Sequence, residues 1–147
     1  MVAKQHPNMT TRHRGLTDRE RAVFEAPVFA HVGIVLPDGT PHVSAVWIDV
    51  DGDDLLINTA EGRTKAQVLQ VGTPVSISAT HPDNPYRNVS VFGRVVEVQD
   101  EEHGGAAGIN RLSKKYTGQA VYGARTVGER RINYRVRPEE VSGWGHD

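Results

Sequence analysis

The chain has 147 residues, a formal net charge of -1 and no cysteine. A chain of this length suits one domain with a single core. Its 17 lysines and arginines are spread along the sequence, so we expect no nucleic-acid partner. The absence of cysteine excludes disulfide frameworks and thiolate metal sites. No stretch approaches the roughly 20 apolar residues of a membrane span, so we expect a soluble, cytoplasmic protein without a membrane partner.

The N-terminal residues 1–16 have no apolar periodicity that could offset the entropy of ordering them, so we expect a flexible tail. Residues 17–147 are expected to form one domain. It begins with Thr17 and Glu20, which have the spacing of a capping box, in which each side chain satisfies the other residue's free backbone amide. Pro27 then ends a short helix.

The segment 28–50 reads as two strands rich in β-branched residues. Between them, residues 37–40 (Pro-Asp-Gly-Thr) supply the dihedral angles of a tight turn, which predicts a β-hairpin. A second turn at 51–53 leads into a strand at 55–59. We therefore expect three consecutive antiparallel strands in a meander, which disfavours a parallel βαβ fold.

Residues 63–70 suit a helix that ends before Gly72, and residues 75–80 alternate as a fourth strand. Two prolines stiffen the loop expected at 81–86.

A long strand is expected at 88–98, with Gly93 as a bulge where the sheet bends into a barrel. A helix at 105–116 and a last strand at 131–137 follow. The fold class that these elements predict is mainly β, as one six-stranded antiparallel barrel with about three short helices.

The segment 61–65 (Glu-Gly-Arg-Thr-Lys) places two cations and a hydroxyl at the start of a predicted helix. A helix N-terminus is partially positive, so each cation would cost about 0.3 to 1 kcal/mol unless an anion lies between them. Backbone amides, a guanidinium and a hydroxyl would give a phosphate several donors. From these five residues alone, a solvated basic turn is the ordinary alternative.

Other motifs are weak. The seven histidines form no HExxH motif, and without cysteine the usual ligand sets are incomplete, so we expect no metal site. No serine lies in a GxSxG elbow, and the glycines of 104–108 lack the GxGxxG pattern of a dinucleotide site.

Three segments read together resemble a known family. They are residues 30–47 (AHVGIVLPDGTPHVSAVW), 56–59 (LINT) and 62–66 (GRTKA). In this order and spacing they look like the pyridoxamine 5′-phosphate oxidase-like superfamily. Within it, the chain is most similar to the actinobacterial group that uses the deazaflavin coenzyme F420. The resemblance is clearest from Pro27 to about Val98.

The resemblance implies an FMN-binding type of split barrel that forms a homodimer, with two equivalent cofactor sites in grooves between the subunits. It implies that three residues bind the cofactor's phosphate: Arg63, Thr64 and Lys65. Two strand segments would line the tricyclic ring: His42, Ser44, Val46, Asn58 and Thr59. Alternation along a strand puts the first three of these on one face, although an ordinary polar-edged strand would have the same pattern.

The loop that carries Pro85, Tyr86 and Arg87 would reach across the dimer to the partner's cofactor, although Tyr86 could equally serve packing. Trp144 could cover the groove, but an aromatic residue at this place more often seals a core edge or an interface.

The activity that the resemblance implies is hydride transfer from the reduced deazaflavin to a small conjugated organic substrate. The cofactor then carries the chemistry, and the protein supplies orientation, water exclusion and a proton. Ser44 and Tyr86 are the candidate proton donors.

Two alternatives stay open. One is an FMN-binding oxidase or reductase of the same fold, although the segment 141–147 offers no arginine for the substrate phosphate of pyridoxamine phosphate oxidases. The other is a carrier or sensor that binds F420 or haem without turnover.

Overall fold

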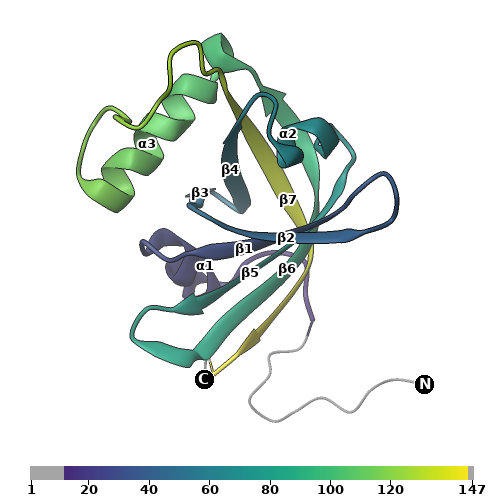
Figure 1. Ribbon diagram of the computed structural model, residues 1–147. Helices are drawn as coiled ribbons and strands as arrows, with labels where there is room; N and C mark the ends of the chain where they lie inside the picture. Colours follow the sequence, from purple (N-terminus) through teal and green to yellow (C-terminus); the bar gives the residue numbers. More distant parts are fainter. Residues whose placement is uncertain (1–11, 146–147) are drawn as a thin grey trace.

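The computed structural model describes residues 12–145 (Figure 1). The helices are α1 (Asp18–Glu25), α2 (Thr64–Val68), the 3₁₀ helix η1 (Glu101–His103) and α3 (Gly105–Thr117). The strands are β1 (Ala30–Val35), β2 (Pro41–Val46), β3 (Asp49–Asp51), β4 (Asp54–Ala60), β5 (Pro74–His81), β6 (Asn84–Gln99) and β7 (Arg131–Trp144). Within residues 12–145, no helix is both long and apolar enough to cross a membrane.

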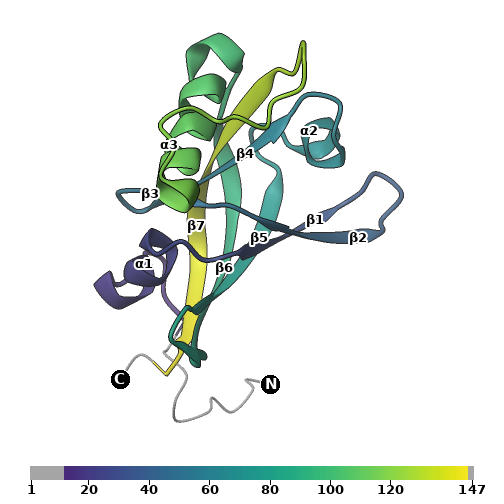
Figure 2. The same ribbon diagram turned by 60° about the vertical axis from the view of Figure 1, so that its left-hand side comes forward.

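The strands form one antiparallel sheet in the order β2-β1-β5-β6-β7-β4-β3. The sheet curls around a core without closing, and its two edges are β2 and β3 (Figures 1 and 2). This is the mainly β split barrel that the sequence predicts. The short strand β3 brings the described strands to seven, where six were predicted.

The predicted meander is only partly right. The turn at 51–53 joins two antiparallel strands, β3 and β4, but β2 and β4 are not neighbours in the sheet. Strand β2 pairs with β1 at one edge of the sheet, whereas β4 pairs with β7 and β3 at the other edge. The chain crosses from one edge to the other through Trp47 and Ile48. All seven residues of β4 are buried, so both faces of this strand are covered. A position beside the exposed β1–β2 hairpin would not cover both faces.

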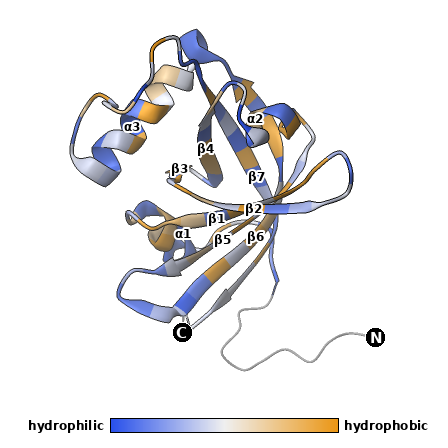
Figure 3. Cartoon of the chain, in the orientation of Figure 1, coloured by the Kyte–Doolittle hydropathy of each residue, from blue (hydrophilic) through white to orange (hydrophobic). Residues whose placement is uncertain are grey.

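The core lies inside the curl of the sheet. Buried residues alternate along β1 and β5, as they do in strands with one covered face. Phe24 of α1, Leu55 of β4 and Tyr134 of β7 are among the largest fully buried side chains. Burial raises the pKa of Tyr134 to about 12. Hydrophobic and hydrophilic residues alternate along β7 in Figure 3.

The capping box at the start of α1 is confirmed. The backbone amide of Glu20 donates to Thr17 Oγ1 (3.2 Å), and that of Thr17 donates to Glu20 Oε1 (2.8 Å). The Glu20 side chain is fully buried, and its Oε1 also lies 2.7 Å from His13 Nε2. One carboxylate therefore joins the helix start to the segment that precedes it.

That segment, residues 12–16, is tied to β7. The backbones of His13 and Val141 exchange two hydrogen bonds of 3.0 and 2.6 Å. Arg12 pairs with Glu140 at 2.9 Å. The domain therefore includes residues as early as Arg12, and the rest of the predicted tail, residues 1–11, lies outside the described residues.

The predicted bulge at Gly93 is confirmed. The register between β6 and β7 shifts between Phe92 and Gly93. A Cβ atom on Gly93 would lie 2.4 Å from the carbonyl oxygen of Arg137. Only glycine allows the two long strands to approach this closely at the bend.

We expect Gly93→Ala to lower the free energy of unfolding by about 1 to 3 kcal/mol, because the added methyl group pushes β6 and β7 apart. Chemical denaturation measures this change. The matched control is Gly123→Ala, since nothing lies within 4 Å of a Cβ atom built there. Its effect should stay within about 0.5 kcal/mol. Equal unfolding midpoints for the two variants would contradict the close approach.

Candidate functional site

A cavity of about 250 Å³ opens where the barrel is split, and we call it the split pocket. The end of β2 and the residue after it supply Ala45, Val46 and Trp47, and β4 supplies Asn58 and Thr59. Helix α3 and the loop after it form a further wall, on the side where α3 lies along β4 and β7 (Figure 2). The pocket therefore lies between the two separated halves of the sheet.

Three cations line the split pocket: Arg63, Lys65 and Arg131. None of the lining residues, all of which lie within 12–145, is acidic. Lys65 Nζ donates to Ser44 Oγ at 2.9 Å. Burial, and then the positive charge of Arg63, lowers the pKa of Lys65. A surplus of positive charge in a partly buried pocket attracts an anion.

Helix α2 has five residues, fewer than the predicted 63–70, and its N-cap Arg63 makes no side-chain capping hydrogen bond. So short a helix aligns few peptide dipoles at its start. The helix start therefore adds little to the positive charge of the split pocket, which comes mainly from the side chains of its lining cations.

Arg131 is a pocket residue that the sequence did not predict. Its side chain is only 4% exposed. Its Nε donates to Asn58 Oδ1 at 2.9 Å, and its Nη1 donates to Glu129 Oε2 at 3.3 Å. The other oxygen of Glu129 lies 3.6 Å from Arg63. One carboxylate is thus shared by two guanidinium groups.

The amide of Asn58 is used within the protein. Its Nδ2 donates to the carbonyl of Gly105 (3.0 Å) and to Asn133 Oδ1 (3.2 Å). Helix α3 packs directly on this layer, because a Cβ atom on Gly108 would lie 2.5 Å from Asn133 Oδ1. Asn58 therefore holds α3 and the guanidinium of the pocket floor in place, and its amide side chain is committed to these contacts.

Aromatic rings form another wall of the pocket. Trp47 stacks on Tyr116 with ring centroids 5.0 Å apart, and Tyr122 meets Trp47 edge-on at 6.0 Å. The Tyr116 hydroxyl accepts a hydrogen bond from the backbone amide of Ile48 (3.0 Å), which fixes this ring. Phe29, which is 64% exposed, stands at the pocket mouth. The wall offers a flat apolar surface to a planar ligand.

The structure brings five of the predicted site residues into the split pocket: Val46, Asn58, Thr59, Arg63 and Lys65. Ser44 is connected to the pocket through its hydrogen bond with Lys65.

The other predicted residues lie elsewhere. His42 lies further along β2, and its buried Nδ1 has no hydrogen-bond partner among the described residues. Thr64 faces a separate hollow beside the β1–β2 hairpin. Pro85, Tyr86 and Arg87 belong to β6, because the predicted loop at 81–86 is a hairpin between β5 and β6. Within one chain these three residues do not line the split pocket.

Trp144 ends β7 opposite Asn88 and does not line the pocket. The aromatic residues that do are Phe29, Trp47 and Tyr122. The sequence carried no local signal for Arg131, since alternation along the last strand puts it with Asn133 and Arg135 on a polar face, opposite Tyr134. This part of the face is buried because α3 packs against it in the structure.

One exposed group of possible metal ligands occurs in the described part of the chain: Asp100, Glu102 and His103. Asp100 Oδ1 lies 2.6 Å from His103 Nδ1, and Glu102 pairs with Arg130 at 2.6 Å. These contacts already engage the three side chains, and no further observation points to a metal.

We expect the Lys65 amine to titrate below its ordinary value of 10.5. Arg63→Gln should raise the pKa of Lys65 part of the way back, because it removes a nearby like charge. Added sulfate should also raise it, since an anion stabilises the charged amine. NMR titration of the Lys65 side-chain nitrogen measures each value, with Arg94→Gln, which lies outside the pocket, as the control. A pKa at or above 10.5 in the wild type would contradict a desolvated cation.

Comparison with known proteins identifies the family of the chain. The chain matches the pyridoxamine 5′-phosphate oxidase family over residues 16–145. No curated protein matches the chain. Among solved structures, a protein named F420 reductase is 28% identical with a TM-score of 0.74, over 86% of this chain and 98% of its own.

Two further structures share the fold at lower identity. A conserved hypothetical protein from Mycobacterium tuberculosis is 20% identical with a TM-score of 0.68, over 98% of this chain and 91% of its own. The FAD and heme binding protein from Mycobacterium smegmatis is 20% identical with a TM-score of 0.62, over 90% of this chain and 73% of its own. Because the family match spans nearly the whole described domain, this chain belongs to the pyridoxamine 5′-phosphate oxidase family.

Proposed function

We propose that the protein is an oxidoreductase that binds the deazaflavin F420 in the split pocket and reduces a small conjugated organic substrate. The observation that carries the proposal is the group of three cations, Arg63, Lys65 and Arg131, in a pocket whose lining residues include no acid. The similarity to a protein named F420 reductase supports the choice of cofactor.

The residues present fit such a cofactor. Arg63 and Lys65 lie at the pocket mouth, where a phosphate would receive charge-assisted hydrogen bonds. Val46, Trp47 and Thr59 give a planar ring an apolar wall with a hydroxyl beside it. Lys65 gains most from an anion, because its burial in the free protein disfavours its charge.

The chain's own residues would serve the reaction in three ways. Arg63 and Lys65 hold the phosphate, and Ile109 and Leu112 of α3 exclude water from the pocket. When bound, the reduced deazaflavin supplies the hydride. Ser44 is the candidate proton donor within the chain. It does not itself line the pocket, but its oxygen accepts a hydrogen bond from the lining residue Lys65, which leaves its own proton for another acceptor. Tyr86 lies outside this pocket, so it could act only from a second subunit.

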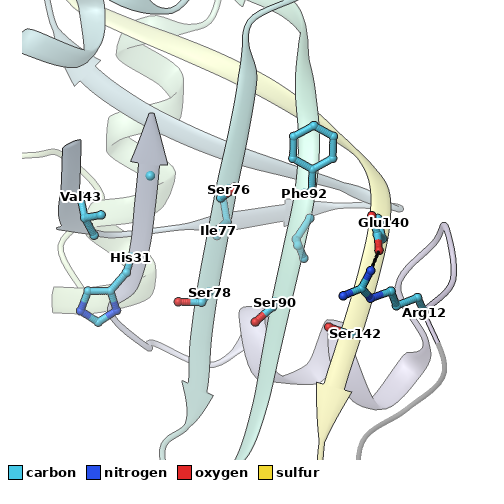
Figure 4. A pocket seen from close by; sticks show the side chains of 12 residues that line it. Arg12, His31, Val43, Ser76, Ile77, Ser78, Ser90, Phe92, Glu140 and Ser142 are labelled. Atoms are coloured by element: carbon cyan, nitrogen blue, oxygen red, sulfur yellow. Dashed lines mark ion pairs between the residues drawn. The ribbon is translucent and has the colours of Figure 1, made fainter. Parts of the chain in front are cut away.

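A second copy of the chain would complete the site. The split pocket holds about 250 Å³, below the range of roughly 300 to 1,000 Å³ that is usual for small-molecule sites. A broad sheet face is open for a partner. It carries four serines from three strands, beside the larger side chains of His31 and Phe92 (Figure 4): Ser76, Ser78, Ser90 and Ser142. We therefore propose a homodimer that uses this face, with Pro85, Tyr86 and Arg87 reaching the partner's cofactor.

FMN is the second candidate cofactor. It also combines a phosphate with a tricyclic ring, and the family's name refers to an oxidase of a phosphorylated substrate. A carrier without turnover would use the same pocket.

The cofactor proposal predicts tight binding of F420 that depends on the two cations at the pocket mouth. Arg63→Ala and Lys65→Ala should each weaken F420 binding roughly tenfold or more, because each removes a charge-assisted hydrogen bond to phosphate. Fluorescence titration with F420 and with FMN measures the affinities, and Arg94→Ala, outside the pocket, is the control. Tight FMN binding without F420 binding would select the second candidate. Multiple turnovers with candidate enones would separate an enzyme from a carrier.

The dimer proposal predicts a solution mass twice that of the 16.1-kDa chain. Ser78→Arg should produce monomers and weaken F420 binding, because a large cation in the middle of the sheet face blocks close contact between copies. Light scattering after size exclusion measures the mass. Gln119→Arg adds the same group at an exposed position after α3 and should leave the dimer intact. A monomeric wild type that binds F420 tightly would rule the shared site out.

A further inference from the structure

Arg131 differs from the other two cations of the split pocket in its surroundings. The side chain of Arg63 is 58% exposed, whereas that of Arg131 is only 4% exposed. Lys65 has a serine hydroxyl as its partner, whereas Arg131 has an amide oxygen and a carboxylate. A phosphate at the pocket mouth is already served by the two more accessible cations. Arg131 is therefore a separate, more deeply buried positive charge in the same pocket.

The hydrogen-bonding capacity of Arg131 is only partly used. Its Nε and Nη1 have partners in Asn58 and Glu129, but Nη2 has no hydrogen-bond partner in the part of the chain that the structure describes. Nη2 is also not among the buried side-chain atoms that lack a partner. Because Arg131 lines the cavity, this edge of the guanidinium is open to a molecule in the pocket.

The charge of Arg131 is only partly balanced. Glu129 is the one carboxylate that the guanidinium of Arg131 contacts within residues 12–145, since Glu101 accepts only the backbone amide of Arg131 (2.7 Å). The other oxygen of Glu129 is turned toward Arg63. Two guanidinium groups therefore share one negative charge. A further anion in the pocket would restore the balance.

The orientation of the guanidinium is fixed before any ligand arrives. Asn58 holds its Nε from the strand side, and the ring of Tyr122 lies 5.5 Å from its central carbon. Tyr122 is itself held by its backbone amide, which donates to Asn110 Oδ1 of α3 at 2.9 Å. A donor that is fixed in this way loses little rotamer entropy when it binds an acceptor.

We propose that Arg131 binds a carboxylate or another planar oxyanion of the molecule in the split pocket, at the end away from the phosphate. The proposal deepens the proposed function and rests on it in taking this pocket as the ligand site. Such a group could belong to the organic substrate or to the cofactor ring. In both cases the acceptor lies against Nη2, between the aromatic wall and the pocket floor.

The test compares two probes that differ in charge but hardly in shape, benzoate and benzyl alcohol. Binding to the cofactor-free protein is followed through the indole N–H resonance of Trp47, which lines the pocket and is one of two tryptophans. Trp144→Phe assigns the two signals. The wild type should prefer benzoate by roughly tenfold or more, as expected for a charge-assisted hydrogen bond.

Two variants separate Arg131 from its neighbours. Glu129→Gln should bind benzoate at least as tightly as the wild type, because the competing carboxylate is gone. The double variant Glu129→Gln with Arg131→Gln removes the buried pair as a unit, so no charge is stranded, and should lose the preference for benzoate. Thermal unfolding confirms that both variants fold. A preference that survives in the double variant, or that disappears only in Arg63→Ala or Lys65→Ala, would overturn the proposal.

The affinity of the same variants for F420 identifies the source of the oxyanion. Unchanged F420 affinity in the double variant, together with loss of the benzoate preference, assigns Arg131 to the substrate. A parallel loss of F420 affinity assigns it to the cofactor ring. If F420 does not bind at all while the benzoate preference still depends on Arg131, the cofactor proposal fails and the oxyanion site stands.

Discussion

The close approach of α3 to strands β4 and β7 is the constraint on which the split pocket depends. Cβ atoms on Gly105 or Gly108 would collide with Arg131 and Asn133, so the helix can lie against this layer only with glycine at both positions. The approach brings the carbonyl of Gly105 within hydrogen-bond distance of Asn58. The same contacts bring Ile109 and Leu112 to one wall of the pocket and fix the guanidinium of Arg131 on its floor.

A buried polar layer of this kind is stable only when its groups are paired. Asn58 donates to Asn133 and accepts from Arg131, and Asn133 donates in turn to Gln99. The layer therefore ends on one side in satisfied amides and on the other in a charged group that faces the cavity. Its position between helix and sheet makes the floor of the pocket rigid, while the cations at the mouth remain accessible.

The sequence predicted the local elements well, because they depend on neighbouring residues. The capping box of α1, the first hairpin and the bulge at Gly93 each follow from a short pattern. The pairing of β4 with β7 joins residues that are more than seventy positions apart, and no local pattern specifies it. For the same reason Arg63 and Lys65 could be nominated from one pentapeptide, whereas Arg131 and Tyr122 enter the pocket only through the tertiary fold. The resemblance to a family supplied the order of the motifs but not this opposite wall.

The short segment before α1 has a consequence for the behaviour of the whole sheet. Strand β4 leaves β7 after Val136, so the later part of β7 has β6 on one side only. On the side that β4 leaves free, the backbone of His13 forms hydrogen bonds with the backbone of Val141. The buried carboxylate of Glu20 holds the His13 side chain in place. An unpaired strand edge is a template for adding a strand from another molecule. By pairing with Val141, His13 makes this stretch of β7 less available for strand addition and leaves β2 and β3 as the edges of the sheet.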